Sequence, residues 1–204
     1  MARKSLPNPL SEEEAARLLG RLSPHSMTGL RNQVALLLML RAGLRVSEVC
    51  NLTPGDIQLS EGRLRVHRGK GAKDRVLFLD PQLLERLTLW QARRPPKSRW
   101  LLPVIQSGTR GGGTAKAGSK IQPRYFGNLV ARLAREAGIE RAVSPHVLRH
   151  TYATSELRRG VPIHQLQRDL GHANLATTAV YLHVMDSERQ ESANGRPAME
   201  LPTC

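Results

Sequence analysis

The sequence has few of the features that mark secreted, disulfide-bonded or membrane-spanning proteins. Only two of its 204 residues are cysteine, Cys50 and Cys204, which excludes a disulfide framework and favours a reducing compartment. The longest apolar run, residues 34–40, is far shorter than the roughly 20 residues that cross a bilayer. The N-terminal segment lacks the apolar core of a signal peptide. These absences predict a cytoplasmic protein without a membrane partner, in which residues 34–40 form a buried helix.

Acidic residues are scarce relative to basic ones. The chain carries 31 Lys and Arg against 17 Asp and Glu, a formal net charge of +14 at pH 7. An excess of this size indicates a polyanionic partner, because it creates a positive potential over much of the surface. Nucleic acid is the first partner to consider, an acidic membrane surface is the second, and a basic protein with no such partner is the third alternative.

Helix signals dominate the chain. Ser11 followed by Glu14 forms a capping box, while Gly43 and Gly160 stand where helices end. Proline residues open several of the later helices, where a missing N–H costs nothing. The expected helices cover residues 11–22, 29–42, 46–52, 81–92, 123–137, 145–159, 162–170 and 175–183.

The hydrophobic period changes in one place. Residues 63–67 alternate apolar and polar side chains, and the alternation resumes over residues 75–79, which predicts a β-hairpin with a loop of more than two residues. Residues 100–104 read as a short strand, and the glycine-rich residues 106–120 read as a mobile surface loop. The predicted fold class is therefore mainly α with a small antiparallel β-hairpin or sheet, α+β.

Nucleotide and metal chemistry are both disfavoured. Residues 113–120, GTAKAGSK, nearly match a phosphate-binding loop, but the lysine and hydroxyl residue stand in the wrong order. His146 and His150 have the spacing of metal ligands on a helix, but no glutamate lies between them. The residues between them are Val147, Leu148 and Arg149, and the arginine repels a dication. We therefore expect no cofactor and no bound metal.

A set of basic residues near helix starts and turns suits a phosphodiester. Such a group needs its charge neutralised in the transition state and a proton given to the leaving oxygen. Each residue also has an ordinary structural alternative: an arginine such as Arg45 can form a salt bridge with Glu48, a histidine can cap a helix, and a hairpin lysine can be solvated. The set consists of Arg45, Lys70, His146, Arg149 and His172.

Four segments resemble the signature segments of the tyrosine recombinase (phage integrase) family. They are RAGLRVSEV, GKGAKDR, PHVLRHTYAT and LGHANLATTAVYLHV, and they occur in the family's order. The resemblance implies the catalytic-domain fold of that family over residues 11–184. Residues 1–10 would then be an N-terminal extension and residues 185–204 a C-terminal tail.

The resemblance also implies a role for each residue of the basic set and for one tyrosine. Arg45 and Arg149 would clamp the scissile phosphate, and His172 would help to bind it and stabilise the transition state. His146 would accept a proton or a hydrogen bond. Lys70 would be the general acid for the 5′-oxygen, and Tyr181 would be the nucleophile.

Three further residues compete for these roles. Lys73 lies close to Lys70 on the expected hairpin, although the family's lysine is the one between two glycines. Tyr152 follows Arg149 by three residues on one helix, a position that the family fills with a core aromatic residue. Tyr125 opens another helix and could contact DNA or pack. Only Tyr181 follows the Gly-His segment at the family's spacing.

The implied function is site-specific recombination of double-stranded DNA through a 3′-phosphotyrosyl intermediate, as in an integrase, an invertase or a resolvase. The protein would be nucleoid-associated, a monomer in free solution and a homotetramer on paired DNA sites. The alternatives are a type IB topoisomerase and a DNA-binding regulator without catalysis. Only about ten residues precede the capping box at Ser11, so the chain is expected to be either a minimal family member or a catalytic domain taken from a longer protein.

Overall fold

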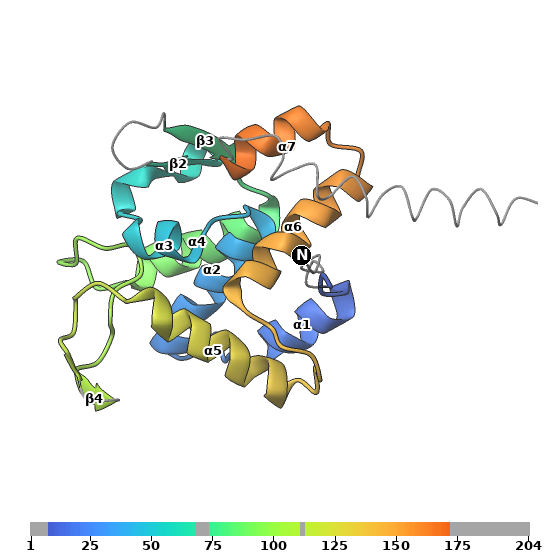
Figure 1. Cartoon of the computed structure of the whole chain (residues 1–204). Coiled ribbons are helices and arrows are strands. Elements are labelled where there is room, and N and C mark those ends of the chain that lie inside the picture. The colour runs from blue at the N-terminus through green and yellow to red at the C-terminus, as the bar shows by residue number, and fades with distance from the viewer. Residues whose placement is uncertain (1–7, 68–73, 111–112, 172–204) are drawn as a thin grey trace, which may run out of the picture.

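The computed structural model describes residues 8–67, 74–110 and 113–171, and this part of the chain is mainly helical with one small sheet (Figure 1). The described α-helices are α1 (Glu12–Gly20), α2 (Met27–Arg41), α3 (Val46–Asn51), α4 (Pro81–Arg93), α5 (Pro123–Glu136), α6 (Pro145–Arg158) and α7 (Ile163–Leu170). The strands are β1 (Ile57–Gln58), β2 (Arg63–Val66), β3 (Arg75–Phe78), β4 (Gly108–Arg110) and β5 (Gly113–Ala115), with 3-10 turns η1 (Pro54–Asp56) and η2 (Leu59–Glu61). The predicted fold class is confirmed.

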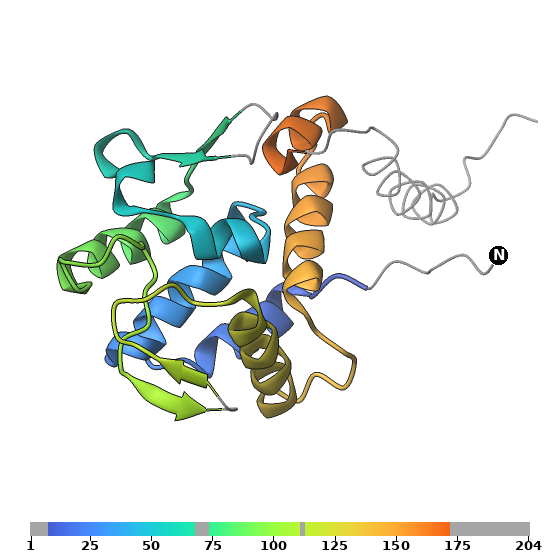
Figure 2. The ribbon, with the colours of Figure 1, turned by 60° about the vertical axis from the view of Figure 1, so that its left-hand side comes forward.

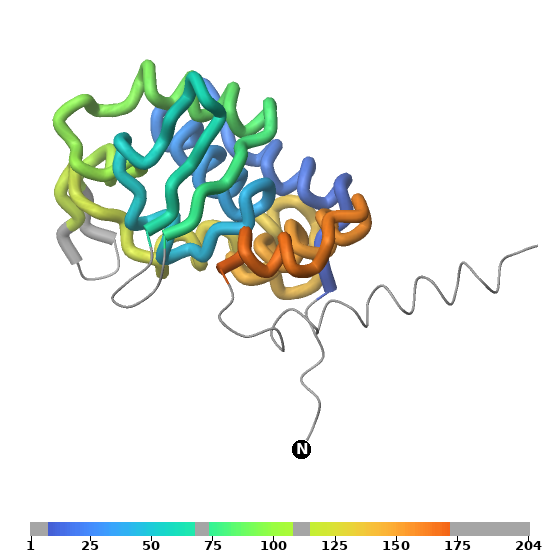
Figure 3. Tube along the Cα trace, turned by 90° about the horizontal axis from the view of Figure 1, so that it is seen from above, coloured from blue at the N-terminus to red at the C-terminus, as the bar shows by residue number. Residues whose placement is uncertain are grey.

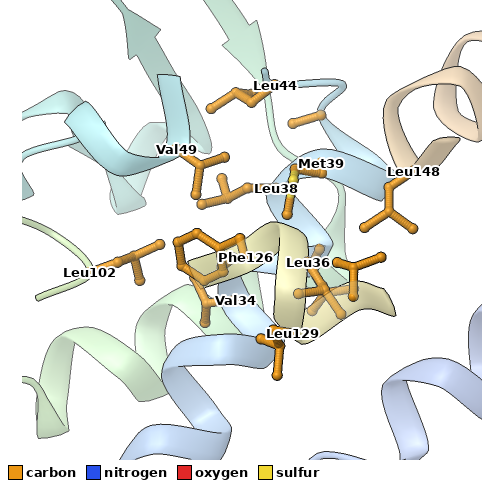
Figure 4. Close-up of a cluster of buried hydrophobic side chains, with 14 of the residues drawn as sticks. Val34, Leu36, Leu38, Met39, Leu44, Val49, Leu102, Phe126, Leu129 and Leu148 are labelled. Atoms are coloured by element: carbon orange, nitrogen blue, oxygen red, sulfur yellow. The ribbon is translucent and has the colours of Figure 1, made fainter. Parts of the chain in front are cut away.

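Helix α2 runs through the centre of the molecule. Ten of its 15 residues are buried, because α3, α4 and α6 pack around it. Figure 4 shows Leu36 and Leu38 of α2 in the same buried cluster as Phe126 of α5 and Leu148 of α6. Each fully buried leucine contributes about 1.5–3 kcal/mol, so α2 organises the main core, as the apolar run at 34–40 predicted. Within the described ranges, no helix combines the length and the apolarity that a membrane crossing requires.

The capping box at the start of α1 is present and is tied to a distant segment. The Glu14 amide donates to Ser11 Oγ at 3.1 Å, and the Ser11 amide donates to the Glu14 carboxylate at 2.9 Å. Arg141 also donates to both Glu14 oxygens, at 2.6 and 2.5 Å. These hydrogen bonds from Arg141 lower the pKa of the Glu14 carboxyl despite the opposing effect of burial. The N-terminal helix is thereby fixed to the connection between α5 and α6.

The main sheet is antiparallel in the order β1-β2-β3. In the β2–β3 hairpin, Leu64 lies opposite Leu77 and Val66 lies opposite Arg75. These four residues are buried, whereas the residues between them face solvent. The predicted hairpin is confirmed, and β1 was not predicted because it is only two residues long. Arg75 is therefore a charged residue on the inward face of β3.

Two local predictions were wrong. Residues 100–104 do not form a strand; they are held by single bonds, such as the Leu101 amide to the Leu52 carbonyl at 2.7 Å and an isolated bridge between Pro103 and Lys120. Residues 106–120 are not wholly irregular, because β4 and β5 pair within them as an antiparallel hairpin. Glycine at both ends of this pairing hid the strand signal, since it is depleted in strands. The helix expected at 175–183 lies outside the described residues.

A second, smaller core joins α6 to α7. It consists of Ala153, Leu157, Leu166 and Leu170, whereas the first turn of α6 belongs to the main core through Leu148. In Figure 2 the β2–β3 hairpin and α7 lie at one end of the molecule, and α1 and α5 lie at the other. Figure 3 shows α7 next to β3 when seen from above, and these two elements are in contact. The region between the two cores is where α3, β3, α6 and α7 meet.

Candidate active site

Arg149 lies in this region and is almost fully buried. Its residue is 4% exposed, and its guanidinium donates to the Gly43 carbonyl at 2.5 Å and to the Leu170 carbonyl at 2.6 Å. The Glu48 carboxylate lies 3.8 Å away. A buried charge is tolerated only where hydrogen bonds compensate its lost hydration, and these carbonyls do so. Arg149 is therefore held between the end of α2 and the end of α7.

Arg45 reaches the same place from the start of α3. Its backbone amide donates to the Glu48 carboxylate at 2.8 Å, the acidic half of a capping box. Its guanidinium donates to Glu48 at 3.2 Å and to the Leu170 carbonyl at 3.4 Å. The side chain is 42% exposed. Arg45 and Arg149 thus share one carbonyl and one carboxylate, which supports their predicted pairing and also confirms the Arg45–Glu48 salt bridge.

A third arginine, Arg75, completes the cluster from the inward face of β3. It donates through both terminal nitrogens to the two Glu48 oxygens, at 2.9 and 2.8 Å, and through Nε to the Asp169 carbonyl at 2.7 Å. Burial alone raises the pKa of the Glu48 carboxyl, but the hydrogen bonds from Arg75 and from the Arg45 amide outweigh it, so the net pKa lies below its usual value. Glu48 is therefore ionised at neutral pH.

The hydrogen-bonded cluster is positively charged. Among the described residues, three guanidinium groups meet one carboxylate, and the other acceptors of their hydrogen bonds are neutral carbonyls. Carbonyls at the C-terminal end of α7 carry only part of a negative charge. Over the described residues the cluster thus has an excess of positive charge, and a phosphodiester with charge on its non-bridging oxygens suits such a site.

His146 stands one helical turn before Arg149 on α6. It is exposed, and Pro145 occupies the first position of the helix. Within the described part of the chain, no hydrogen bond fixes its ring. Positions i and i+3 share a helix face, so His146 is placed on the same side of α6 as Arg149, and its role as a proton acceptor stays a prediction.

Three predicted site residues lie outside the described ranges: Lys70, His172 and Tyr181. The same holds for Lys73. The structure describes the chain that leads up to His172 and the residues on both sides of the segment that contains Lys70. Residue 172 follows Gly171, which ends α7 with a positive φ of 66°, directly after the carbonyl that Arg149 and Arg45 bind. Residue 70 lies between His67 and Asp74. The roles of these residues stay predictions.

The two ends of that hairpin segment are joined by His67. Its Nδ1 lies 2.7 Å from the Asp74 carboxylate, and its Nε2 lies 2.9 Å from the Asp56 carboxylate. The hydrogen bond to Asp74, assisted by Asp56, raises the pKa of His67 although burial opposes it. Protonated His67 donates to both carboxylates and ties β2, β3 and η1 together.

We expect this link to weaken as pH rises. Because the folded-state pKa of His67 is raised, its stabilisation is fully present below the ordinary histidine pKa of about 6.5 and is lost as pH rises through the raised value. The side chain is 56% exposed, so the contribution is below about 1 kcal/mol. Urea unfolding of the wild type and of His67→Gln at several pH values measures it. A stability difference that grows with pH would contradict the assignment.

The two competing tyrosines occupy structural positions. Tyr152 is half-buried and packs against Gly43 and the α6–α7 core, and its burial strongly raises the pKa of its hydroxyl. The Tyr125 hydroxyl accepts hydrogen bonds from Arg31 at 2.6 Å and Asn32 at 3.1 Å. Neither of these partners belongs to the arginine cluster. Packing and hydrogen bonding thus account for both tyrosines without a role in catalysis.

A glycine is required at position 43 by the backbone conformation and by the neighbouring Tyr152 ring. Its φ is +62°, and a methyl group there would lie 2.3 Å from the Tyr152 ring. We expect Gly43→Ala to lower the free energy of unfolding by roughly 2–5 kcal/mol and to displace the carbonyl that binds Arg149. Gly127→Ala in α5 is the control: a methyl group there meets no neighbouring side chain among the described residues, and a gain of about 0.5–1 kcal/mol is expected. Equal stability of the two variants in thermal unfolding would contradict the prediction.

The sequence alone indicates Glu48 only as a salt-bridge partner of Arg45 and indicates no role for Arg75. A signal for Arg75 was present, because the alternation of β3 places it on the same face as Leu77. A charged residue on an inward face requires a buried partner. The partner could not be read from the sequence, since Glu48 is 27 residues away.

Comparison with known proteins assigns the chain to a family. Residues 8–188 match the phage integrase family. The tyrosine recombinase XerA of Thermococcus kodakarensis is 39% identical over 181 residues, which cover 89% of this chain and 60% of that protein. The chain spans about three fifths of the length of the curated relatives it matches.

Solved structures agree. The crystal structure of XerA recombinase has a TM-score of 0.77 to this chain at 33% identity, over 98% of this chain and 67% of that one. XerH site-specific recombinase, bound to palindromic difH substrate in a post-cleavage complex, has a TM-score of 0.73 at 26% identity, over 94% of this chain and 54% of that one. With a family match over most of its residues and a helical fold that confirms it, the chain belongs to the phage integrase family, the tyrosine recombinases.

Proposed function

We propose that this chain is the catalytic part of a site-specific DNA recombinase that cuts and rejoins double-stranded DNA through a 3′-phosphotyrosyl intermediate. The observation that carries the proposal is the convergence of Arg45 and Arg149 on the Leu170 carbonyl, two residues before His172, in a cluster with excess positive charge. Relatives named as tyrosine recombinases, and a relative bound to its difH substrate, support it.

The arginines would act on the transition state. Arg45, with 42% of its side chain exposed, offers donors to the non-bridging oxygens, and the buried Arg149 supplies a fixed charge behind it. A guanidinium held in place before the reaction does not have to reorganise when charge develops, and this is the main source of electrostatic catalysis. His172 would add one further donor to the same phosphate.

The chemical step is a transfer of a phosphoryl group from one oxygen to another. The Tyr181 oxygen forms a bond to phosphorus while the bond from phosphorus to the 5′-oxygen breaks. His146 would take the tyrosine proton, and Lys70 would give a proton to the 5′-oxygen. The phosphotyrosyl ester keeps the energy of the broken bond, so a 5′-hydroxyl from another strand can reverse the step. The proposed reaction needs neither ATP nor a metal.

A plasmid assay separates this function from its alternatives. A library of supercoiled plasmids, each with two copies of one fragment of the source genome, is incubated with the protein, and products are identified by sequencing and topoisomer gels. Inversion or deletion between copies is the expected result. Relaxed topoisomers without rearrangement would indicate a type IB topoisomerase, and a gel shift without either product would indicate a DNA-binding regulator. Any of these activities requires a compartment that contains DNA, so we place the protein with the nucleoid.

We further propose that the protein is a monomer in free solution and a tetramer on paired DNA sites. Recombination of two duplexes requires four strand cleavages. Residues 185–204 are polar, with Met199 and Leu201 as the only large apolar residues after Met185, so the tail has little apolar surface to bury on its own domain. We propose that the tail docks on a neighbouring protomer of the tetramer.

Deletion of residues 194–204 tests the tail. The truncated protein is expected to bind a single DNA site with unchanged affinity and to lose synapsis and strand exchange, as measured by gel shift and by the plasmid assay. Full recombination by the truncated protein would leave the tail without this function. A stable tetramer in light scattering without DNA would contradict the monomer.

A further inference from the structure

The hydrogen bonds of Arg75 go to other groups of the protein. Its side chain is 8% exposed, and three of its nitrogens donate to Glu48 and to the Asp169 carbonyl at 2.7–2.9 Å. Both terminal nitrogens of Arg75 bind the Glu48 carboxylate, whereas the hydrogen bonds described for the similarly buried Arg149 go to two neutral carbonyls. The charge of Arg75 is therefore matched by a carboxylate, and its place beside the phosphate clamp requires an explanation other than phosphate binding.

The distances to Glu48 show how the single carboxylate is shared. Arg75 binds both of its oxygens, at 2.9 and 2.8 Å. The Arg45 side chain has one contact at 3.2 Å, and Arg149 is 3.8 Å away. A bidentate pair is the strongest geometry between a guanidinium and a carboxylate. Glu48 is thus paired most closely with Arg75 and less closely with the two arginines of the clamp.

We propose that Arg75 is a positioning residue that holds the Glu48 carboxylate away from the two arginines of the clamp and so preserves their positive charge for the scissile phosphate. The inference rests on the proposed function of Arg45 and Arg149. In the absence of Arg75, Glu48 has lost its bidentate partner and is buried beside two other guanidinium groups. It turns toward them, because an unpaired buried carboxylate is strongly unfavourable, and the clamp is neutralised.

A purely structural role is the alternative. Arg75 joins β3 to α3 and α7, so its removal could act only by loosening these elements. The two explanations differ for a double variant. If Glu48 neutralises the clamp, then Glu48→Gln added to Arg75→Ala restores the clamp charge. If the connection between the elements is what matters, the double variant has lost one more hydrogen-bonding group. Its folded protein is then no more active than folded Arg75→Ala.

The first measurement is the single-turnover rate of covalent adduct formation on a nicked DNA substrate, with saturating protein and with each rate divided by the folded fraction from circular dichroism. Arg75→Ala is expected to be slower by roughly 10²-fold, with Arg75→Lys less affected and the double variant within roughly tenfold of wild type. Arg65→Ala is the matched control, since it removes a charge from the outward face of the same hairpin; a change within about threefold is expected. A double variant as slow as Arg75→Ala overturns the proposal.

The second measurement does not depend on catalysis. Thermal unfolding is compared in sodium phosphate and in sodium chloride of equal ionic strength and pH. Phosphate is expected to raise the melting temperature of the wild type and of the double variant, but to raise that of Arg75→Ala much less. If phosphate shifts the melting temperatures in this way but the wild type forms no DNA adduct, the proposed function is contradicted and the role of Arg75 is supported. An adduct in the wild type, with equal phosphate effects in all variants, would sink the role of Arg75 alone.

Discussion

Tyr181→Phe is expected to bind DNA as the wild type does and to form no covalent adduct. The substitution removes one oxygen atom, which leaves the arginine cluster and the basic surface intact, and no other group of the side chain can attack phosphorus. The loss should therefore be complete rather than partial. A denaturing gel with a labelled, nicked substrate detects the adduct, and a gel shift measures binding.

The matched controls are Tyr152→Phe and Tyr125→Phe. Tyr152 packs against Gly43, and the Tyr125 hydroxyl is bound by Arg31 and Asn32, so both variants should keep the adduct, even where stability falls by about 1–3 kcal/mol through unpaired buried donors. An adduct that persists in Tyr181→Phe and disappears in one of the controls would move the nucleophile to that tyrosine.

Much of the fold could be predicted because its signals are local. The capping box at Ser11 and Glu14, the apolar run of α2 and the alternation of β2 and β3 each depend on neighbouring residues. The errors arose where the signal is not local. Residues 100–104 look like a strand by composition, but within the described ranges they pair only through the isolated bridge of Pro103 with Lys120. The β4–β5 hairpin is built largely from glycine and threonine.

The residues of the site could be predicted from the sequence better than their arrangement in space. Resemblance to the family supplied Arg45 and Arg149, and the structure brings both to the Leu170 carbonyl. The charge balance of the site could not be predicted, because it depends on Glu48 and Arg75 meeting across 27 residues of chain. Hydrogen bonds between distant side chains follow from tertiary packing and leave no periodic pattern in the sequence.

The burial of Arg149 explains why its loss should be more severe than the loss of His146. Arg149→Ala removes a fixed positive charge and also leaves the Gly43 and Leu170 carbonyls without their donor. Loss of an arginine that stabilises a phosphoryl transition state costs about 10³–10⁵-fold in rate. His146 is exposed, and general-base catalysis contributes typically about 10²–10⁴-fold, a part of which water can replace at an exposed position.

We therefore expect the rate of adduct formation to fall in the order wild type, His146→Ala, Arg149→Ala, in single-turnover cleavage of a nicked substrate by saturating protein. Arg149→Lys separates charge from geometry: its ammonium keeps the charge, but lacks the planar fork that reaches two carbonyls at once, so it should lie between Arg149→Ala and the wild type. Melting temperatures and DNA affinity exclude unfolding as the cause. Equal losses at the two positions, or a greater loss at His146, would mean that proton transfer rather than charge neutralisation limits cleavage.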